Sequence, residues 1–346
     1  MRLPCSEVVS LPAVPGLTVA RRSFAKAARP SYPSVINHPR TLMLRLALAL
    51  LLLATTAQAA TLDRIREAGV LRCGGVPRAG LAAPGPNGMT GLEVDLCRAL
   101  AAAVLGDPAR IEFHPYVLNQ DFDRLRRGED AVAFLTGSEL LGNGLLDAVV
   151  PGPAVFHQTN GVMVPAGNPA QHLADLAGTM VCAEPGTGPE RTLLAWFRSR
   201  GLPLRFSGWQ EQEEMLDAFD VGRCPAVALD TTALAAERAA ADPGHPIRIL
   251  PEPLSASPVL AVTGLDDARW AAVVGWTVQT LQQADARALP VPGAGLGLAP
   301  DWQARVLAGG TLADLVTRHL GGSLKLPAGM EAAWQNGGLV MPAAAE

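Results

Sequence analysis

Hydrophobic and polar positions in residues 60–286 follow two alternating patterns. Short apolar runs bounded by glycine, proline or charged residues predict buried strands, whereas apolar residues at every third or fourth position predict amphipathic helices. The predicted strands cover residues 70–74, 110–117, 131–135, 161–165, 179–184, 204–208, 226–230, 247–251 and 258–264. The predicted helices cover residues 62–69, 92–105, 120–129, 189–200, 212–222, 231–241 and 267–286. Strands and helices that take turns in this way indicate parallel strands with crossover helices, the α/β class.

The series of strands and helices runs once and then restarts after residues 166–178. We therefore expect two α/β lobes, each a mainly parallel sheet with flanking helices. The strand at 258–264 and the helix after it are not needed to complete the second lobe, so we expect the chain to cross back to the first. The expected division is residues 60–164 for the first part of lobe 1, 165–256 for lobe 2, and 257–346 for the completion of lobe 1 and a C-terminal helical tail.

Residues 43–59 have the pattern of an export signal. Arg45 is followed by an apolar run from Leu46 to Ala54 and then by the small residues of Ala57-Gln58-Ala59. The run is far shorter than the roughly 20 apolar residues of a spanning helix, which disfavours the alternative of a membrane anchor. We expect cleavage before Ala60 and a periplasmic protein. Residues 1–42 are proline-rich, basic and aperiodic, and we interpret residues 1–59 as a misassigned leader plus the signal peptide.

Loss of residues 1–59 changes the charge of the chain. It removes seven positive residues and one negative residue, so the formal net charge moves from −4 to −10. Lys325 is then the only lysine. A strongly acidic chain of this kind argues against a nucleic-acid partner.

Four cysteines remain in the expected mature chain: Cys73, Cys97, Cys182 and Cys224. In an oxidising compartment such thiols pair, and four cysteines allow three pairings. Metal binding is the alternative, but the sequence has no Cys-x-x-Cys and no His-x-x-x-His spacing. Disulfides are therefore favoured, and we expect no metal and no cofactor.

Two strand ends carry residues that suit a small ligand, because ligands of open parallel sheets bind beyond the carboxyl ends of the strands. Gly186 and Thr187 stand between a predicted strand and a helix that begins at Pro189, where free N–H groups and the helix dipole attract an anion. Asp230 ends another strand and could receive a ligand ammonium. The alternative for both Thr187 and Asp230 is a purely structural helix cap.

A third strand end opens the segment 136–144, which we expect to be a solvated loop within an irregular stretch that lasts to about residue 158. Thr136, Ser138 and Asn143 can donate or accept hydrogen bonds there, and Glu139 adds negative charge. No catalytic set is apparent, since Ser138 lacks the Gly-x-Ser-x-Gly elbow of a nucleophile. We expect a binding protein and not an enzyme.

Several strings of the sequence resemble the periplasmic solute-binding proteins of general L-amino-acid ABC transporters, in solute-binding protein family 3. They are TLDRIREAGVLRCG, DLCRALAAAVLGDPARIEF, LAGTMVCAEPGTGPERTL, GRCPAVALDTTALAAER and SLKLPAGMEAAWQNGGLV. The resemblance runs from about Thr61 to Leu339. It implies two lobes of the Venus-flytrap type II fold, joined by two crossover strands and closing on an amino acid. It also implies a monomer that delivers its ligand to a permease in the inner membrane.

The resemblance implies roles for individual residues. Asp230 matches the family acid that holds the ligand ammonium, and Thr187 matches a threonine that helps to bind the carboxylate. The four cysteines also match, and pairing within lobes, Cys73 with Cys97 and Cys182 with Cys224, leaves closure unopposed.

One family residue is missing from the opening loop. The family arginine that binds the ligand carboxylate is replaced by Asn143, and a family tryptophan is replaced by Glu139. Either Arg78 or Arg191 compensates, or the ligand lacks an α-carboxylate and is a cation or a neutral polar solute. The runner-up functions are a dehydratase-like periplasmic enzyme and a degenerate accessory or sensor domain.

Overall fold

The computed structural model describes residues 60–117, 119–265, 267–282 and 290–321. The predicted leader, signal peptide and most of the predicted C-terminal tail lie outside these ranges. Among the described helices, none combines the length and apolar character needed to span a bilayer.

The first half of the described chain follows the predicted order of elements, with additions. Its elements are α2 (Thr61–Ala68), β1 (Leu71–Gly75), β2 (Ala83–Gly85), β3 (Gly88–Thr90), α3 (Leu92–Leu105), β4 (Ile111–Pro115), η1 (Asn119–Phe122), α4 (Asp123–Arg126), β5 (Val132–Thr136) and α5 (Gly137–Gly142). Helices α2 and α3 both end at a glycine in the left-handed conformation, Gly69 and Gly106, which needs no strain at a residue without Cβ.

The second half repeats the alternation and then adds helices. Its elements are β6 (Val149–Pro165), η2 (Leu173–Leu176), β7 (Met180–Ala183), α6 (Gly188–Ser199), β8 (Arg205–Gly208), α7 (Gln212–Asp220), β9 (Val227–Asp230), α8 (Thr231–Ala240), β10 (Ile247–Ile249), β11 (Ser255–Gly264), α9 (Ala268–Gln282), α10 (Gly293–Leu296), α11 (Trp302–Leu307), α12 (Leu312–Val316) and η3 (Thr317–Gly321).

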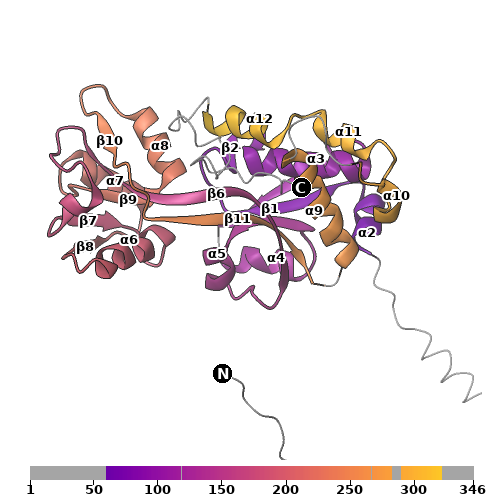
Figure 1. The fold of residues 1–346 in the computed structure, drawn as a ribbon, viewed down its shortest axis with the longest axis horizontal. Helices are drawn as coiled ribbons and strands as arrows, with labels where there is room; N and C mark the ends of the chain where they lie inside the picture. Colours follow the sequence, from indigo (N-terminus) through magenta and orange to yellow (C-terminus); the bar gives the residue numbers. More distant parts are fainter. Residues whose placement is uncertain (1–59, 118, 266, 283–289, 322–346) are drawn as a thin grey trace, which may run out of the picture. The chain divides into compact units, whose positions relative to one another are not determined.

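The strands form a mixed sheet in the order β4-β1-β5-β11-β6-β9-β7-β8, with β10 paired to β6. Strands β4, β1 and β5 are parallel to one another, as are β8, β7 and β9. Between these two parallel sets, the long strands β6 and β11 run antiparallel to each other (Figure 1). This arrangement confirms the predicted α/β fold with two parallel sets of strands and two crossover strands.

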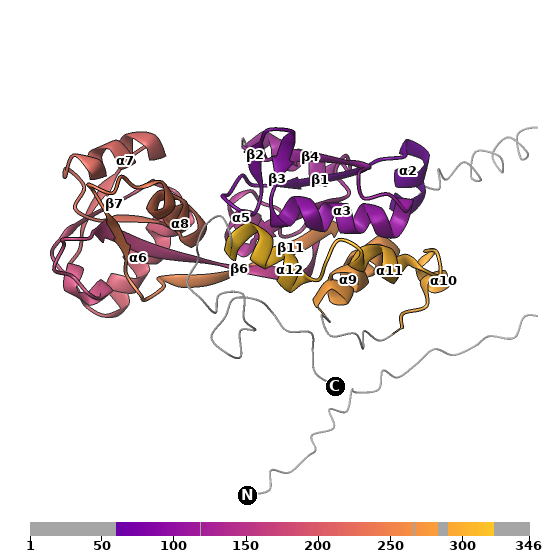
Figure 2. The same ribbon diagram turned by 90° about the horizontal axis from the view of Figure 1, so that it is seen from above.

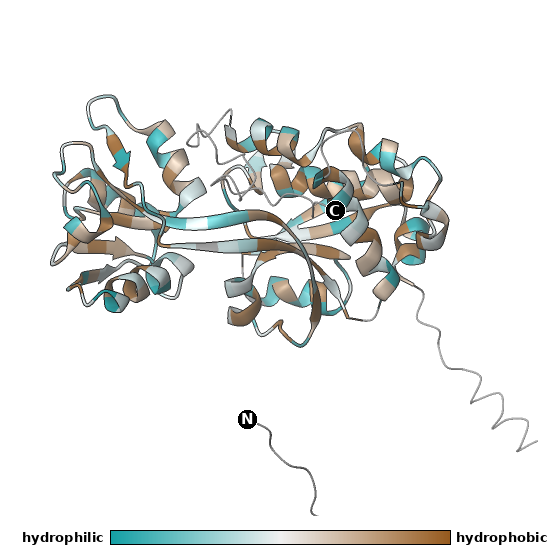
Figure 3. Ribbon diagram, in the orientation of Figure 1, coloured by the Kyte–Doolittle hydropathy of each residue, from teal (hydrophilic) through white to brown (hydrophobic). Residues whose placement is uncertain are grey.

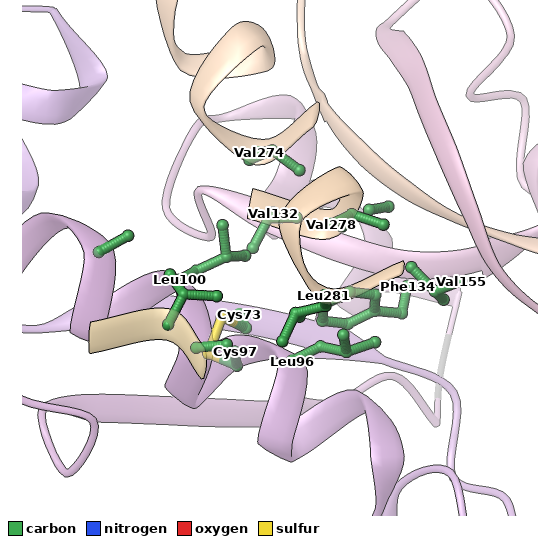
Figure 4. Packing of buried hydrophobic residues seen from close by; sticks show 14 of the residues in the cluster. Cys73, Leu96, Cys97, Leu100, Val132, Phe134, Val155, Val274, Val278 and Leu281 are labelled. Atoms are coloured by element: carbon green, nitrogen blue, oxygen red, sulfur yellow. A yellow bond between two sulfur atoms is a disulfide. The ribbon is translucent and has the colours of Figure 1, made fainter. Parts of the chain in front are cut away.

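Buried apolar residues gather around each parallel set. The largest cluster joins β1, α3 and β5 to α9, with Cys73, Leu100, Phe134 and Val274 among its members (Figure 4). Helices α9, α11 and α12 contact α3 (Figure 2), so the end of the described chain packs on the first set of elements. A separate cluster around β7, β9 and α6 includes Phe197.

The two disulfides pair as the resemblance implies. Cys73 on β1 is bonded to Cys97 on α3, and Cys182 on β7 is bonded to Cys224 just before β9. Each bridge links a strand to a neighbouring segment in the same parallel set, so neither bridge joins one set to the other. The predicted disulfides are confirmed.

Three local predictions were wrong. Strand β6 begins at Val149, where we expected an irregular stretch to about residue 158. The segment after β5 is the short helix α5 and not a solvated loop, because Thr136 and Glu139 form a capping box. The predicted helix over residues 120–129 is reduced to η1 and the single turn α4.

Candidate functional site

A cavity of about 340 Å³ is lined by residues from both halves of the chain. All nine predicted ligand-binding residues line it: Arg78, Thr136, Ser138, Glu139, Asn143, Gly186, Thr187, Arg191 and Asp230. The cavity is also lined by Gly188 and Pro189 of the predicted anion-binding turn, and by four residues that sequence reasoning missed, which are Gly142, Gln158, Asn160 and Ser257. The structure therefore brings the predicted set together, while the ligand-binding role of each residue stays a prediction.

One wall of the cavity is the N-terminus of α6. Thr187 is its N-cap, accepts a hydrogen bond from the N–H of Glu190 (3.5 Å) and donates its hydroxyl proton to the carbonyl of Glu184 (2.6 Å). Gly186 precedes it with φ +80°, a left-handed conformation that favours glycine. Within the described chain, the N–H groups of Thr187 and Gly188 have no hydrogen-bond partner. The turn is both a cap and a candidate anion site.

Arg191 lies next to this turn. Its Nη1 donates to the carbonyl of Gly186 at 2.6 Å, which holds the guanidinium beside the free N–H groups. Among the described residues it forms no ion pair with a carboxylate, and its side chain is exposed. Its positive charge is therefore available to an anionic group in the cavity.

Asp230 stands at the end of β9 and caps α8. Its Oδ1 accepts hydrogen bonds from the N–H of Ala233 (2.9 Å) and the hydroxyl of Thr232 (2.8 Å). Its Oδ2 has no partner within the described chain. The two interpretations made from the sequence are compatible, since one oxygen caps the helix while the other remains free for a donor in the cavity.

The opposite wall is α5. The N–H of Thr136 donates to Oε2 of Glu139 (2.7 Å), and the N–H of Glu139 donates to the Thr136 hydroxyl (3.3 Å). Asn143 ends the helix, and its Nδ2 donates to the carbonyl of Glu139 at 2.9 Å. Ser138 is exposed on the first turn. The cap fixes Glu139 with one carboxylate oxygen turned to its own helix and the other available to a cation.

The cation that pairs with Glu139 is Arg78, which also pairs with Glu93. Its Nη2 pairs with Oε1 of Glu139, and its Nη1 donates to Oε1 of Glu93 at 3.0 Å. Burial opposes the charge of Arg78, but the carboxylate of Glu139, which also accepts a hydrogen bond from Arg78, outweighs this with the help of the nearby carboxyl group of Glu93 and raises the pKa of Arg78 above the ordinary value. One guanidinium thus serves two carboxyl groups.

Glu93 is the buried member of this triad. Its side chain is fully enclosed at the start of α3, and its Oε2 has no hydrogen-bond partner in the described residues. Burial raises the pKa of Glu93 to about 8, even though Arg78 acts in the other direction. Glu93 therefore keeps its proton at neutral pH, and the charge of Arg78 is balanced by Glu139.

The floor of the cavity comes from the crossover strands. Gln158 and Asn160 on β6 stand opposite Ser257 and Ser255 on β11, and Asn160 also stands opposite Asp230 on β9. Figure 3 shows this part of β6 as hydrophilic, in contrast to the apolar strand β5. The polar run before Gly161 was present in the sequence, but only the pairing of the strands shows that alternate residues face the cavity.

The described residues contain no cluster of three or more His, Cys, Asp or Glu side chains that could hold a metal ion. The charged groups of the cavity are two arginines, Arg78 and Arg191, and two carboxylates, Glu139 and Asp230. The fold and the cavity together define a two-lobed α/β binding protein.

Comparison with known proteins agrees with this class. No protein-family model matches the chain. The general L-amino acid-binding periplasmic protein AapJ of Rhizobium johnstonii is 28% identical over 316 residues, covering 83% of this chain and 93% of the relative. The glutamate/glutamine/aspartate/asparagine-binding protein BztA of Rhodobacter capsulatus is 29% identical over 318 residues, covering 84% and 94%.

Among solved structures, an ABC transporter periplasmic binding protein from Brucella ovis with glutathione bound has a TM-score of 0.69 and 29% identity. The match covers 81% of this chain and 98% of that chain. These likenesses confirm the resemblance to amino-acid-binding periplasmic proteins and the two-lobed fold.

Proposed function

We propose that the protein is the periplasmic substrate-binding component of an ABC importer for amino acids or related small polar solutes. The observation that carries the proposal is the cavity between residues of both halves of the chain, lined by two cations, two carboxylates and otherwise by neutral residues, several of them polar. The names of AapJ, BztA and the Brucella ovis protein support amino acids or glutathione as the ligand class and a membrane permease as the partner.

The charges favour a zwitterionic ligand. Its carboxylate meets the free N–H groups of Thr187 and Gly188 and the guanidinium of Arg191, and its ammonium meets Oδ2 of Asp230. Arg78 already has two carboxyl partners, so of the two candidate arginines Arg191 is better placed to replace the missing family arginine at Asn143.

Binding drives closure if the ligand contacts residues on both sides of the crossover strands. A ligand that touches α6 and Asp230 on one side and α5 on the other binds the closed form better than the open form, and so shifts the population toward closure. Closure is then the signal that the permease recognises. The disulfides support this mechanism because each lies within one parallel set of strands.

A cation or neutral polar solute is the alternative ligand class, favoured by the acids Glu139 and Asp230 and by the absence of the family arginine at Asn143. The alternative of a dehydratase-like enzyme would need Glu139 or Asp230 as a general acid or base. Both carboxylates are held by helix caps, and Glu139 is also paired with Arg78.

Isothermal calorimetry of the purified protein tests the proposal. The panel contains the twenty L-amino acids, glutathione, the α-hydroxy acids that lack the ammonium and the decarboxylated amines that lack the carboxylate. We expect micromolar or tighter binding of at least one zwitterion and loss of binding for both of its truncated counterparts. Binding of the decarboxylated amine as tightly as the amino acid would support the alternative ligand class, and no binding at millimolar concentration would refute the proposal.

A further inference from the structure

Gln158 is a buried residue of the crossover strand β6 that lines the cavity, with a relative exposure of 5%. Its Oε1 has no hydrogen-bond partner in the described residues, although the side chain is enclosed. A buried amide oxygen without a partner destabilises a fold, so an oxygen in this position at a cavity wall indicates an acceptor for a ligand.

The direction of the amide is fixed by a chain of hydrogen bonds. The hydroxyl of Thr232 is 2.8 Å from Oδ1 of Asp230, and a carboxylate can only accept, so Thr232 donates. A hydroxyl has one proton, so Thr232 must accept from Gln158, whose Nε2 lies 3.3 Å away. The amide nitrogen of Gln158 is thus committed to Thr232, and the carbonyl oxygen is the polar atom of this cavity-lining side chain that has no partner among the described residues.

The same strand register places this oxygen and Asp230 on one side of the sheet. Asn160 stands opposite Asp230, and Gln158 is two residues before Asn160 on β6, so the three side chains share a face. Ser257, opposite Gln158, also lines the cavity. The face offers two free acceptors, Oε1 of Gln158 and Oδ2 of Asp230, to a group that carries several N–H bonds.

We propose that Gln158 is a specificity-determining residue whose Oε1 accepts a second hydrogen bond from the ligand ammonium that Asp230 binds. The site then selects primary ammonium groups over nitrogen atoms with a single N–H, because a single N–H cannot serve both acceptors. This inference rests on the proposed function. It means that the crossover strand β6 contacts the ligand directly.

The experiment compares wild type with Gln158→Met, which keeps the size of the side chain and removes the acceptor. Each protein is titrated with the tightest ligand among the L-amino acids and glutathione and with its N,N-dimethyl derivative, which has one N–H. We expect Gln158→Met to weaken the primary-ammonium ligand about ten- to hundredfold and to change the dimethyl ligand less than about threefold. Gln282→Met is the control, since Gln282 donates to the carbonyl of Ala154 outside the cavity, and it should bind both ligands as wild type does.

Equal weakening of both ligands would assign Gln158 a merely structural role and overturn the inference, as would no weakening of either. If the dimethyl ligand binds neither protein, a crystal structure with the primary-ammonium ligand decides. A ligand nitrogen within 3.5 Å of Oε1 supports the inference, and a longer distance overturns it. Failure of wild type to bind any probe refutes the proposed function itself and the inference with it.

Discussion

Replacement of Glu93 by Gln should change how stability depends on pH. The folded state raises the pKa of this carboxyl from 4.5 to about 8, because burial and the negative charge of Glu139 oppose its ionisation more than Arg78 favours it. A carboxyl whose pKa is raised in the folded state contributes fully to the free energy of unfolding below pH 4.5, and this contribution is lost as the pH rises through 8. Gln keeps the shape of the protonated carboxyl and does not titrate.

The magnitude follows from the two pKa values. At pH values between the two pKa values, Glu93 has lost its proton in the unfolded state and keeps it in the folded state. The free energy of unfolding of wild type therefore falls by up to about 1.4 kcal/mol per pH unit relative to Glu93→Gln. From pH 5 to pH 8 the difference between the two proteins should change by about 3 kcal/mol in favour of the variant.

Urea denaturation followed by tryptophan fluorescence at several pH values measures this difference, with the disulfides intact. Other titrating groups are common to both proteins and cancel. Glu112→Gln is the matched control, since Glu112 pairs with Arg72 at the surface and should alter stability by at most about 0.5 kcal/mol. A difference between wild type and Glu93→Gln that stays constant from pH 5 to pH 8 would show that Glu93 is ionised when buried and would refute the reasoning.

Three further predictions concern the fold and the anion turn. The double variant Cys182→Ser/Cys224→Ser, which opens a loop with a sequence separation of 42, should lower the free energy of unfolding by roughly 4 kcal/mol, and a loss below about 1 kcal/mol in denaturant titration would contradict this. Gly74→Ala would place a Cβ 2.2 Å from Cζ of Tyr116, so it should cost about 1–3 kcal/mol, whereas unchanged stability of this variant in thermal unfolding would count against the close contact of the Tyr116 ring with Gly74 on β1. Arg191→Met should weaken the binding of a carboxylate ligand by about tenfold or more in calorimetry. Arg205 is an exposed arginine on β8 outside the cavity, so Arg205→Met should leave the affinity unchanged. Equal affinities for the two variants would exclude Arg191 as the carboxylate partner.

Much of the fold was predictable because each parallel strand is a short apolar run followed by a helix with its own stop signal. The start of β6 was not, because residues 149–160 mix prolines, glycine and polar residues, and their extended form depends on pairing with β11. Helix α5 was missed although Thr136 and Glu139 have the spacing of a capping box, since the glycines around them favoured a loop.

The candidate site was predictable where the residues lie at strand ends, as with Thr187 and Asp230. The partners of Arg78 were not predictable, because Glu93 and Glu139 are 15 and 61 residues away and only the folded chain brings them together. The free oxygen of Gln158 depends in turn on strand register and on the hydroxyl of Thr232, and neither can be read from a local pattern.

The central claim is that Asp230 holds the positive end of a small solute. The most direct test is calorimetry of Asp230→Asn with the ligand that binds wild type most tightly, beside Asp242→Asn, an exposed turn residue outside the cavity. The amide can still accept at the helix cap but lacks the charge that attracts an ammonium, so we expect affinity to fall by about 30-fold or more while Asp242→Asn binds normally. Wild-type affinity in folded Asp230→Asn would contradict the account.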